Sequence, residues 1–169
     1  MVTASYVIGI GSNRRHGRHG APERIVRAAI DALAAAGLRI DARSPILRTP
    51  ALGPGGRDFA NAAIRARSER APPALLALLK RAERDFGRRR GQRWGARVLD
   101  LDILAWSGGA WRSRTLTIPH VALAQRRFAI GPAAKVAPGW RHPRLRVSFR
   151  QLEARLVAPR PVDRASRGQ

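Results

Sequence analysis

Two aspartates, Asp100 and Asp102, lie one residue apart in the apolar stretch VLDLDIL, although the chain has only 11 acidic residues against 33 Lys and Arg. Successive side chains of a strand point to opposite faces, so both carboxylates would share one face, with Cα atoms roughly 7 Å apart. Two such carboxylates repel each other unless cations lie between them. The spacing suits two divalent cations that share phosphate oxygens with a substrate, whereas an isolated D-x-D is more often a solvated pair neutralised by arginines.

The segment that precedes the two aspartates favours the phosphate interpretation. Guanidinium groups bind phosphate oxygens through two parallel hydrogen bonds and are always charged. A flat Trp94 ring lies in the same segment, although a lone Trp is more often a core residue. Neither a complete G-x-G-x-x-G nor a G-x-x-x-x-G-K-[ST] motif is present, so any ATP would bind without these loops. The arginines of the segment are Arg88, Arg90, Arg93 and Arg97.

Strands and helices that would position these residues follow from the hydrophobic pattern. The order is β-α-β-β-α-β, which is typical of an α+β, ferredoxin-like fold with an antiparallel sheet flanked by helices in an α-β-α sandwich. SGG at 107–109 predicts a hairpin turn with 110–118 as the returning strand, and 119–138 predicts short helices. Long loops are expected at 48–59 and 87–97. Strands are expected near 5–12, 38–47, 61–67 and 98–106, and helices over 22–36 and 72–86.

Composition limits the class of protein. A chain of 169 residues with 44% hydrophobic residues predicts one domain, 1–157, followed by a basic tail, 158–169. Without cysteine there is no disulfide framework, and neither a leader nor a membrane span is recognised, so a cytoplasmic protein without a membrane partner is expected. A net charge of +22 indicates either a polyanionic partner or a compositional bias toward Arg and Ala. Because the arginines are spread over the chain, charge alone does not decide between them.

Five stretches in this order resemble the 6-hydroxymethyl-7,8-dihydropterin pyrophosphokinase family of folate biosynthesis. The resemblance covers about residues 4–155, and its most specific part surrounds RWGARVLDLDIL. It implies an ATP-dependent transferase that moves the β,γ-pyrophosphoryl group of ATP to the hydroxymethyl group of a reduced pterin and releases AMP. The stretches are IGSN at 10–13, RTPALGP…DFANAAI at 48–64, ERDFGRRRGQRWGARVLDLDIL at 83–104, LTIPH at 116–120 and QRRFAIGP…VAP at 125–138.

The resemblance also implies roles for single residues. Asp100 and Asp102 match the pair that holds two Mg²⁺ ions. Arg88 and Arg90 match loop arginines that assist transfer and release. ATP-phosphate contacts are matched by Arg97, His120 and Arg126.

A pterin pocket is implied in the same way. Asn61 matches the residue that hydrogen-bonds the pterin, and Phe59 and Phe128 match aromatic residues that enclose its ring. Trp94 would cover the closed site. Further pocket residues would be Thr49, Pro50 and Leu52, and Glu83 matches an acidic residue whose role stays open. A carboxamide, as both donor and acceptor, and aromatic faces suit a flat heteroaromatic substrate.

Two alternatives stay open beside this interpretation. The first is a nucleic-acid-binding ferredoxin-like domain, although only 5% of the residues are aromatic and no RNP-like motif is present. The second is an inactive homologue, against which the intact acidic pair argues. The chain departs from the family pattern after Asn13, at Arg127 and at Lys135. We expect a monomer that binds ATP and a reduced pterin, without nucleic acid as a partner.

Overall fold

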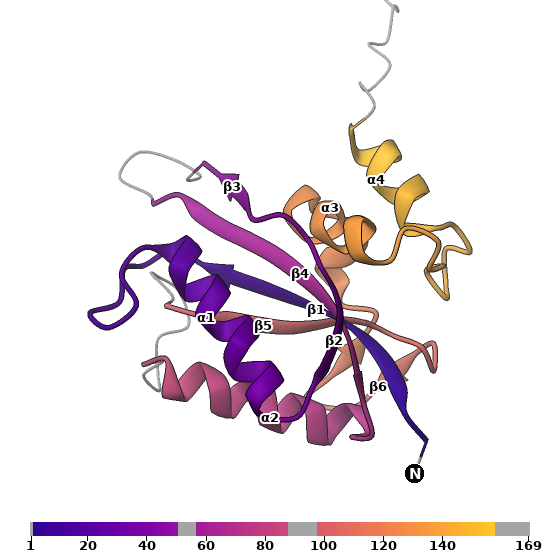
Figure 1. Cartoon of the computed structure of the whole chain (residues 1–169). Helices are drawn as coiled ribbons and strands as arrows, with labels where there is room; N and C mark the ends of the chain where they lie inside the picture. The colour runs from indigo at the N-terminus through magenta and orange to yellow at the C-terminus, as the bar shows by residue number, and fades with distance from the viewer. Residues whose placement is uncertain (1, 51–56, 88–97, 158–169) are drawn as a thin grey trace, which may run out of the picture.

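An antiparallel sheet with helices on both faces forms the centre of the computed structural model, which describes residues 2–50, 57–87 and 98–157 (Figure 1). The strand order is β2-β4-β1-β5, and β3 pairs with β4 beside β2. This confirms the α+β ferredoxin-like order. The strands of this sheet are β1 (Ala4–Ser12), β2 (Arg39–Arg43), β3 (Leu47–Thr49), β4 (Phe59–Ser68) and β5 (Asp100–Trp106).

Helices α1 (Pro22–Ala35) and α2 (Pro72–Asp85) cover one face of the sheet, and each starts with proline at its first turn. Proline suits that position because the first amides of a helix have no partner within it. Apolar side chains of both helices pack against Ile8, Ile64 and Ile103 in the larger of two cores. The helices therefore cover the face opposite to that of the two aspartates.

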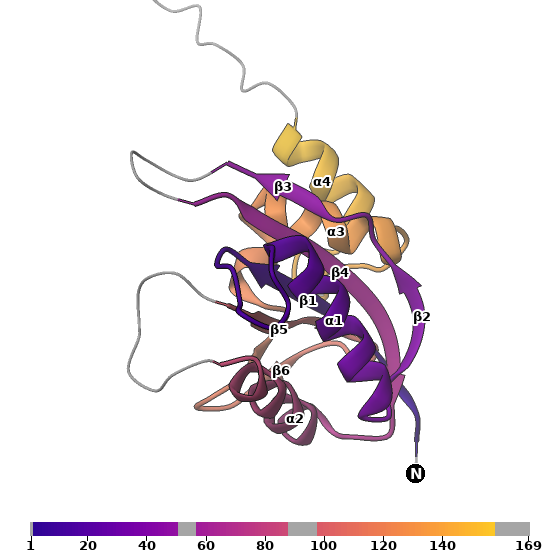
Figure 2. The same ribbon diagram turned by 60° about the vertical axis from the view of Figure 1, so that its left-hand side comes forward.

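The second core lies on the other face, under α3 (Arg127–Val136) and α4 (Phe149–Val157) (Figure 2). Ile130 and Ala133 of α3 pack with Val7, Ala63 and Leu104 of the sheet. Leu104 points to the same side as Asp100 and Asp102, by the alternation of strand side chains. The carboxylates, the Ala63 side chain of β4 and α3 thus lie on the same side of the sheet.

Two expected elements differ from the structure. The strand expected at 38–47 is divided into β2 and β3, and Ser44 lies between them, with its backbone N–H bonded to Ala63 O. The turn predicted at 107–109 is present, with the Gly109 N–H bonded to Trp106 O, but residues 110–118 do not add a strand to the main sheet. They form a separate hairpin of β6 (Trp111–Arg112) and β7 (Thr117–Ile118), followed by the 3₁₀ helix η1 (Val121–Ala124).

Candidate active site

The two aspartates lie on β5 as the alternating pattern predicts. Leu99 and Leu101 are fully buried and Ile103 is 2% exposed, all within the core under α1 and α2. Asp100 and Asp102 are half-buried on the opposite face. The apolar residues therefore fix the strand, and the fixed strand presents both carboxylates on one side.

Glycine separates the carboxylates from β4. Gly11 of β1 is opposite Asp100 on one side and opposite Asn61 on the other, while Gly9 is opposite Asp102. A Cβ atom at Gly11 would lie 3.1 Å from Asn61 Oδ1. Because Gly11 has no side chain, nothing projects from β1 between the amide of Asn61 and Asp100, whereas the side chain of Leu104 lies over Gly9.

Three residues expected in a pterin pocket meet at the end of β4. Asn61 is 8% exposed, and its Nδ2 donates to Thr49 Oγ1 at 3.2 Å. Thr49 is opposite Phe59, a residue that is 39% exposed. The bond to Thr49 orients the amide of Asn61, and Phe59 presents an accessible ring next to it. Pro50, which follows β3, is exposed.

His120 approaches the acidic pair from the segment after β7. Its Nδ1 accepts the Ala122 N–H at 3.1 Å, and its backbone N–H donates to Leu104 O at 3.0 Å. An accepting Nδ1 places the proton of a neutral imidazole on Nε2. That Nε2 lies 3.9 Å from Asp102 Oδ1, beyond hydrogen-bond distance. The ring therefore directs a donor toward the carboxylate without binding it directly.

The electrostatics of the site centre on Asp102. Burial, and then the negative charge of Asp100, raise the pKa of Asp102, whereas His120 and Lys80 act in the opposite direction. A raised pKa means that the ionised carboxylate is disfavoured at this position. Additional positive charge next to the pair would therefore stabilise its ionised form.

Arg126 and Phe128 lie at the start of α3, which packs on the carboxylate side of the sheet. The guanidinium carbon of Arg126 lies 5.6 Å from the centre of the Phe128 ring, so the two form a cation–π pair. The structure places both residues on the side of the sheet that bears Asn61. Other expected site residues lie outside the described residues, namely Leu52, Arg88, Arg90, Trp94 and Arg97.

The structure explains some of the departures from the family pattern. Arg127 donates from Nε and Nη2 to Leu156 O at 2.9 and 2.7 Å, near the end of α4. Lys135 lies 3.8 Å from Glu153 of α4. Both cations therefore connect α3 to α4. After Asn13, the ring of His16 stacks on that of His19, which stacks on Phe86 at the end of α2.

Sequence reasoning left the role of Glu83 open. Glu83 is 1% exposed, and its Oε1 accepts the backbone N–H of Leu101, the residue between the two aspartates, at 2.8 Å. A signal was present, since Glu83 follows Leu75 and Leu79 at spacings of four residues on the buried face of α2. An acid at such a position needs a polar partner within the fold.

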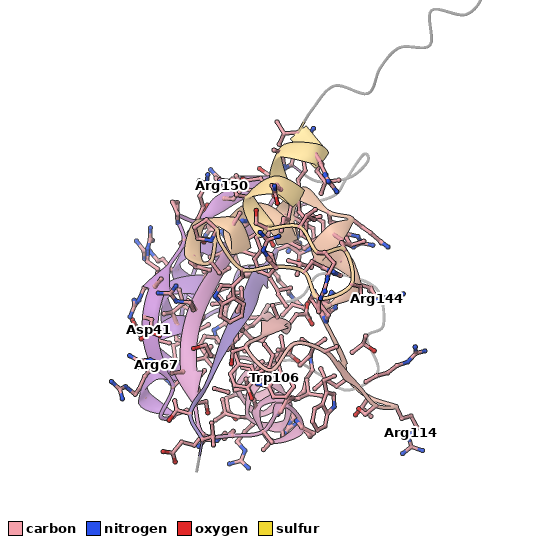
Figure 3. The ribbon with its side chains drawn as sticks, turned by 90° about the vertical axis from the view of Figure 1, so that its right-hand side faces the viewer. Asp41, Arg67, Trp106, Arg114, Arg144 and Arg150 are labelled. Atoms are coloured by element: carbon pink, nitrogen blue, oxygen red, sulfur yellow. The ribbon has the colours of Figure 1, made fainter. Side chains whose placement is uncertain are left out.

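Among the residues that the structure describes, basic side chains extend from several separate segments. Arg114, Arg144 and Arg150 extend outward from separate segments, and Arg67 lies beside Asp41 (Figure 3). Among the described residues, no group of three or more His, Cys, Asp or Glu side chains could hold a metal ion. In the same part of the chain, every helix is too short or too polar to cross a membrane.

Comparison with known proteins gives consistent matches. The family model of 7,8-dihydro-6-hydroxymethylpterin-pyrophosphokinase (HPPK) matches residues 7–138. The 2-amino-4-hydroxy-6-hydroxymethyldihydropteridine pyrophosphokinase of Methylorubrum extorquens is 37% identical over 139 residues, which cover 81% of this chain and 84% of that protein. The enzyme of the same name from Synechocystis sp. is 37% identical over 117 residues, which cover 69% of this chain and 60% of that protein.

Solved structures agree with the fold. The Plasmodium falciparum HPPK-DHPS structure with pteroate superposes with a TM-score of 0.67 over 92% of this chain and 43% of that chain. Its sequence identity to this chain is 13%, so the likeness concerns the fold alone.

Proposed function

The chain belongs to the 7,8-dihydro-6-hydroxymethylpterin-pyrophosphokinase family, and from this membership we propose that it is an ATP-dependent diphosphotransferase of folate biosynthesis. The hydroxymethyl oxygen of the reduced pterin attacks the β-phosphorus of ATP. The bond from that phosphorus to the oxygen bridging the α- and β-phosphates breaks, and AMP leaves with the electron pair. The pterin gains the pyrophosphoryl group, and its hydroxyl proton is released.

One observation supports this proposal most directly: Asn61, Gly11 and Asp100 share a row across three strands. A flat ring held by the Asn61 amide would extend over the glycine toward the carboxylates. Its hydroxymethyl group could then reach phosphates held above Asp100 and Asp102. Phe59, which is accessible beside Asn61, and Phe128 would stack on the ring.

The acidic pair fits Mg²⁺. This ion is usually bound by one or two carboxylates together with substrate phosphates, so no third protein carboxylate is needed. Burial and the charge of Asp100 raise the pKa of Asp102, so cations bound beside the pair would stabilise its ionised form. Asp100 and Asp102 would hold two Mg²⁺ ions, and these would supply positive charge that offsets the negative charge developing on the phosphates during transfer.

The remaining residues would bind and orient ATP. His120 directs its Nε2 proton toward the space next to Asp102, where a phosphate oxygen could accept it. The guanidinium of Arg126, at the exposed start of α3, would pair with phosphates. By family position, Arg88, Arg90 and Arg97 would add further positive charge, and Trp94 would cover the closed site.

The decisive experiment measures AMP released from ATP and 6-hydroxymethyl-7,8-dihydropterin with Mg²⁺. We expect Asp100→Ala and Asp102→Asn each to lower kcat by about 100-fold or more, because removing a group that stabilises transition-state charge has effects of this size. The melting temperature of metal-free Asp102→Asn should not fall, because its neutral amide no longer repels Asp100. Asp41→Asn, at the distant pair with Arg67, is the control and should retain full activity. Unchanged AMP release in both site variants would contradict the assignment.

A further inference from the structure

Leu101 lies on the last strand of the sheet, yet it is fully buried. Strand β5 ends the order β2-β4-β1-β5, so alternate backbone groups of β5 face away from β1. Such groups are unpaired unless another part of the chain covers them. The Leu101 residue is fully buried, and its peptide groups therefore need partners from the protein.

An ion pair on α2 supplies these partners. Glu83 Oε1 accepts the Leu101 N–H at 2.8 Å and a hydrogen bond from Lys80 Nζ at 2.9 Å. The same Lys80 Nζ lies 3.5 Å from Leu101 O. Glu83 and Lys80 thus contact both the N–H and the C=O of the residue between the two aspartates.

The position of this ion pair is informative because a buried charge is costly. A carboxylate with 1% exposure needs both a counter-ion and hydrogen bonds, and the removal of one partner leaves an uncompensated charge. A neutral glutamine could have capped the same N–H at a smaller desolvation cost. Only the charged pair also brings a cation to the Leu101 C=O, because Glu83 Oε1 holds Lys80 Nζ at 2.9 Å beside it.

We propose that Lys80 and Glu83 are positioning residues that hold the backbone between Asp100 and Asp102, and thereby set both carboxylates for divalent cations. This inference rests on the proposed function. The two aspartates repel each other, so their strand must resist local distortion while the cations bind. The contacts of Lys80 and Glu83 with the backbone of Leu101 supply that resistance, although neither residue is assigned a contact with ATP or the pterin.

Two variants separate positioning from simple stability. Glu83→Gln keeps the size of the side chain and an oxygen for the Leu101 N–H, but removes the charge. Lys80→Met keeps the apolar stem of a side chain that is already 37% exposed, and removes only the cation. We expect each to weaken Mn²⁺ affinity in the presence of a non-hydrolysable ATP analogue by about 10-fold or more, as is typical for residues that orient metal ligands.

Hydrogen exchange and steady-state kinetics test the same inference in two further ways. Amide hydrogen exchange of Leu101 in the metal-free protein should become faster in Lys80→Met, because the buried ion pair is broken. The KM for the pterin should stay within about 2-fold of the parent value, whereas the Mg²⁺ concentration for half-maximal rate should rise about 10-fold. Lys80→Arg, which keeps a cation at this position, should retain most of the parental Mn²⁺ affinity that Lys80→Met loses.

The Lys135–Glu153 pair provides matched controls, because Lys135→Met and Glu153→Gln break an ion pair of α3 and α4 away from β5. Both should keep parental Mn²⁺ affinity. Unchanged Mn²⁺ affinity in Glu83→Gln and Lys80→Met would overturn the inference, even if their melting temperatures fell. If the parent protein releases no AMP, the proposed function is wrong. Mn²⁺ affinity and the hydrogen exchange of the Leu101 amide still decide whether Lys80 and Glu83 position the aspartates.

Discussion

Gly11 illustrates how one absent side chain can shape a binding site. It separates Asn61 from Asp100 in the register of three strands, and a Cβ atom there would lie 3.1 Å from Asn61 Oδ1. A contact this short requires the amide to move by a few tenths of an ångström. The amide is held by Thr49, so its movement would also disturb that hydrogen bond.

We therefore expect Gly11→Ala to raise the KM for the pterin about 10-fold, which corresponds to the loss of roughly one hydrogen bond to the substrate. The KM for ATP should change little. Stability should change little as well, because the lower entropy of the unfolded alanine chain offsets about 0.4–1 kcal/mol of the steric cost. Steady-state kinetics with each substrate varied in turn measures the difference. Gly139→Ala is the control, since a Cβ there meets nothing within 4 Å, and equal KM values in both variants would contradict the role of Gly11.

At the scale of elements, the turn between α3 and α4 depends on a neutral histidine. His142 Nδ1 accepts the Leu145 N–H at 3.2 Å, and the His142 backbone groups bond to Val147 O and Arg146 N. Burial, and then the nearby charge of Arg144, lower the pKa of His142. The folded chain therefore binds a proton at this site less readily than the unfolded chain does.

This difference in proton binding predicts the pH dependence of stability. The contribution of His142 is complete above the ordinary histidine pKa of about 6.5, and it declines as the pH falls through that value toward the lowered pKa of the folded state. His142→Asn retains an oxygen that can accept the Leu145 N–H but does not titrate. Urea unfolding from about pH 7.5 to about pH 5 should show a smaller loss of stability in this variant than in the parent. Parallel curves for the two proteins would contradict this expectation.

The predicted elements succeeded where a periodic pattern is buried on one face. The strand holding Asp100 and the helix over 72–86 follow from such patterns, and both are confirmed. The division of 38–47 into β2 and β3 depends on a contact between Ser44 and Ala63 of β4, which local propensity does not contain. The separate hairpin of β6 and β7 likewise depends on pairing that the SGG turn alone could not specify.

Family position predicted Asn61 and Thr49 as neighbours in a pterin pocket. The structure brings the two side chains into contact, and their role in binding the pterin stays a prediction. The use of Glu83 could not be read from the sequence, because its partner Leu101 is 18 residues away on another element. A buried acid at a core position of a helix indicates that a polar partner exists, but only the fold identifies that partner.

At the scale of the whole molecule, the net charge of +22 bears on the choice between a phosphate-binding enzyme and a nucleic-acid-binding domain. The described arginines extend from many elements, and some pair with carboxylates, as Arg67 does with Asp41. Such a distribution raises the local concentration of any anion. It also favours self-repulsion between copies of the chain, and the monomer expected from the sequence stays a prediction.

These charges should influence the two substrates differently. ATP is a polyanion, so raising KCl from about 50 mM to about 300 mM should weaken its binding several-fold, because added salt screens attraction beyond a Debye length of several ångströms. The pterin carries no phosphate, and its affinity should change by less than about 2-fold under the same conditions. Isothermal titration with a non-hydrolysable ATP analogue, and separately with the pterin, measures both effects.

A nucleic-acid-binding domain would instead bind single-stranded RNA tightly, with a steep dependence on salt, and would not bind the pterin at all. That result would favour the alternative over the enzyme, because a general positive field attracts any polyanion, whereas an uncharged ring binds only through specific contacts such as those proposed for Asn61.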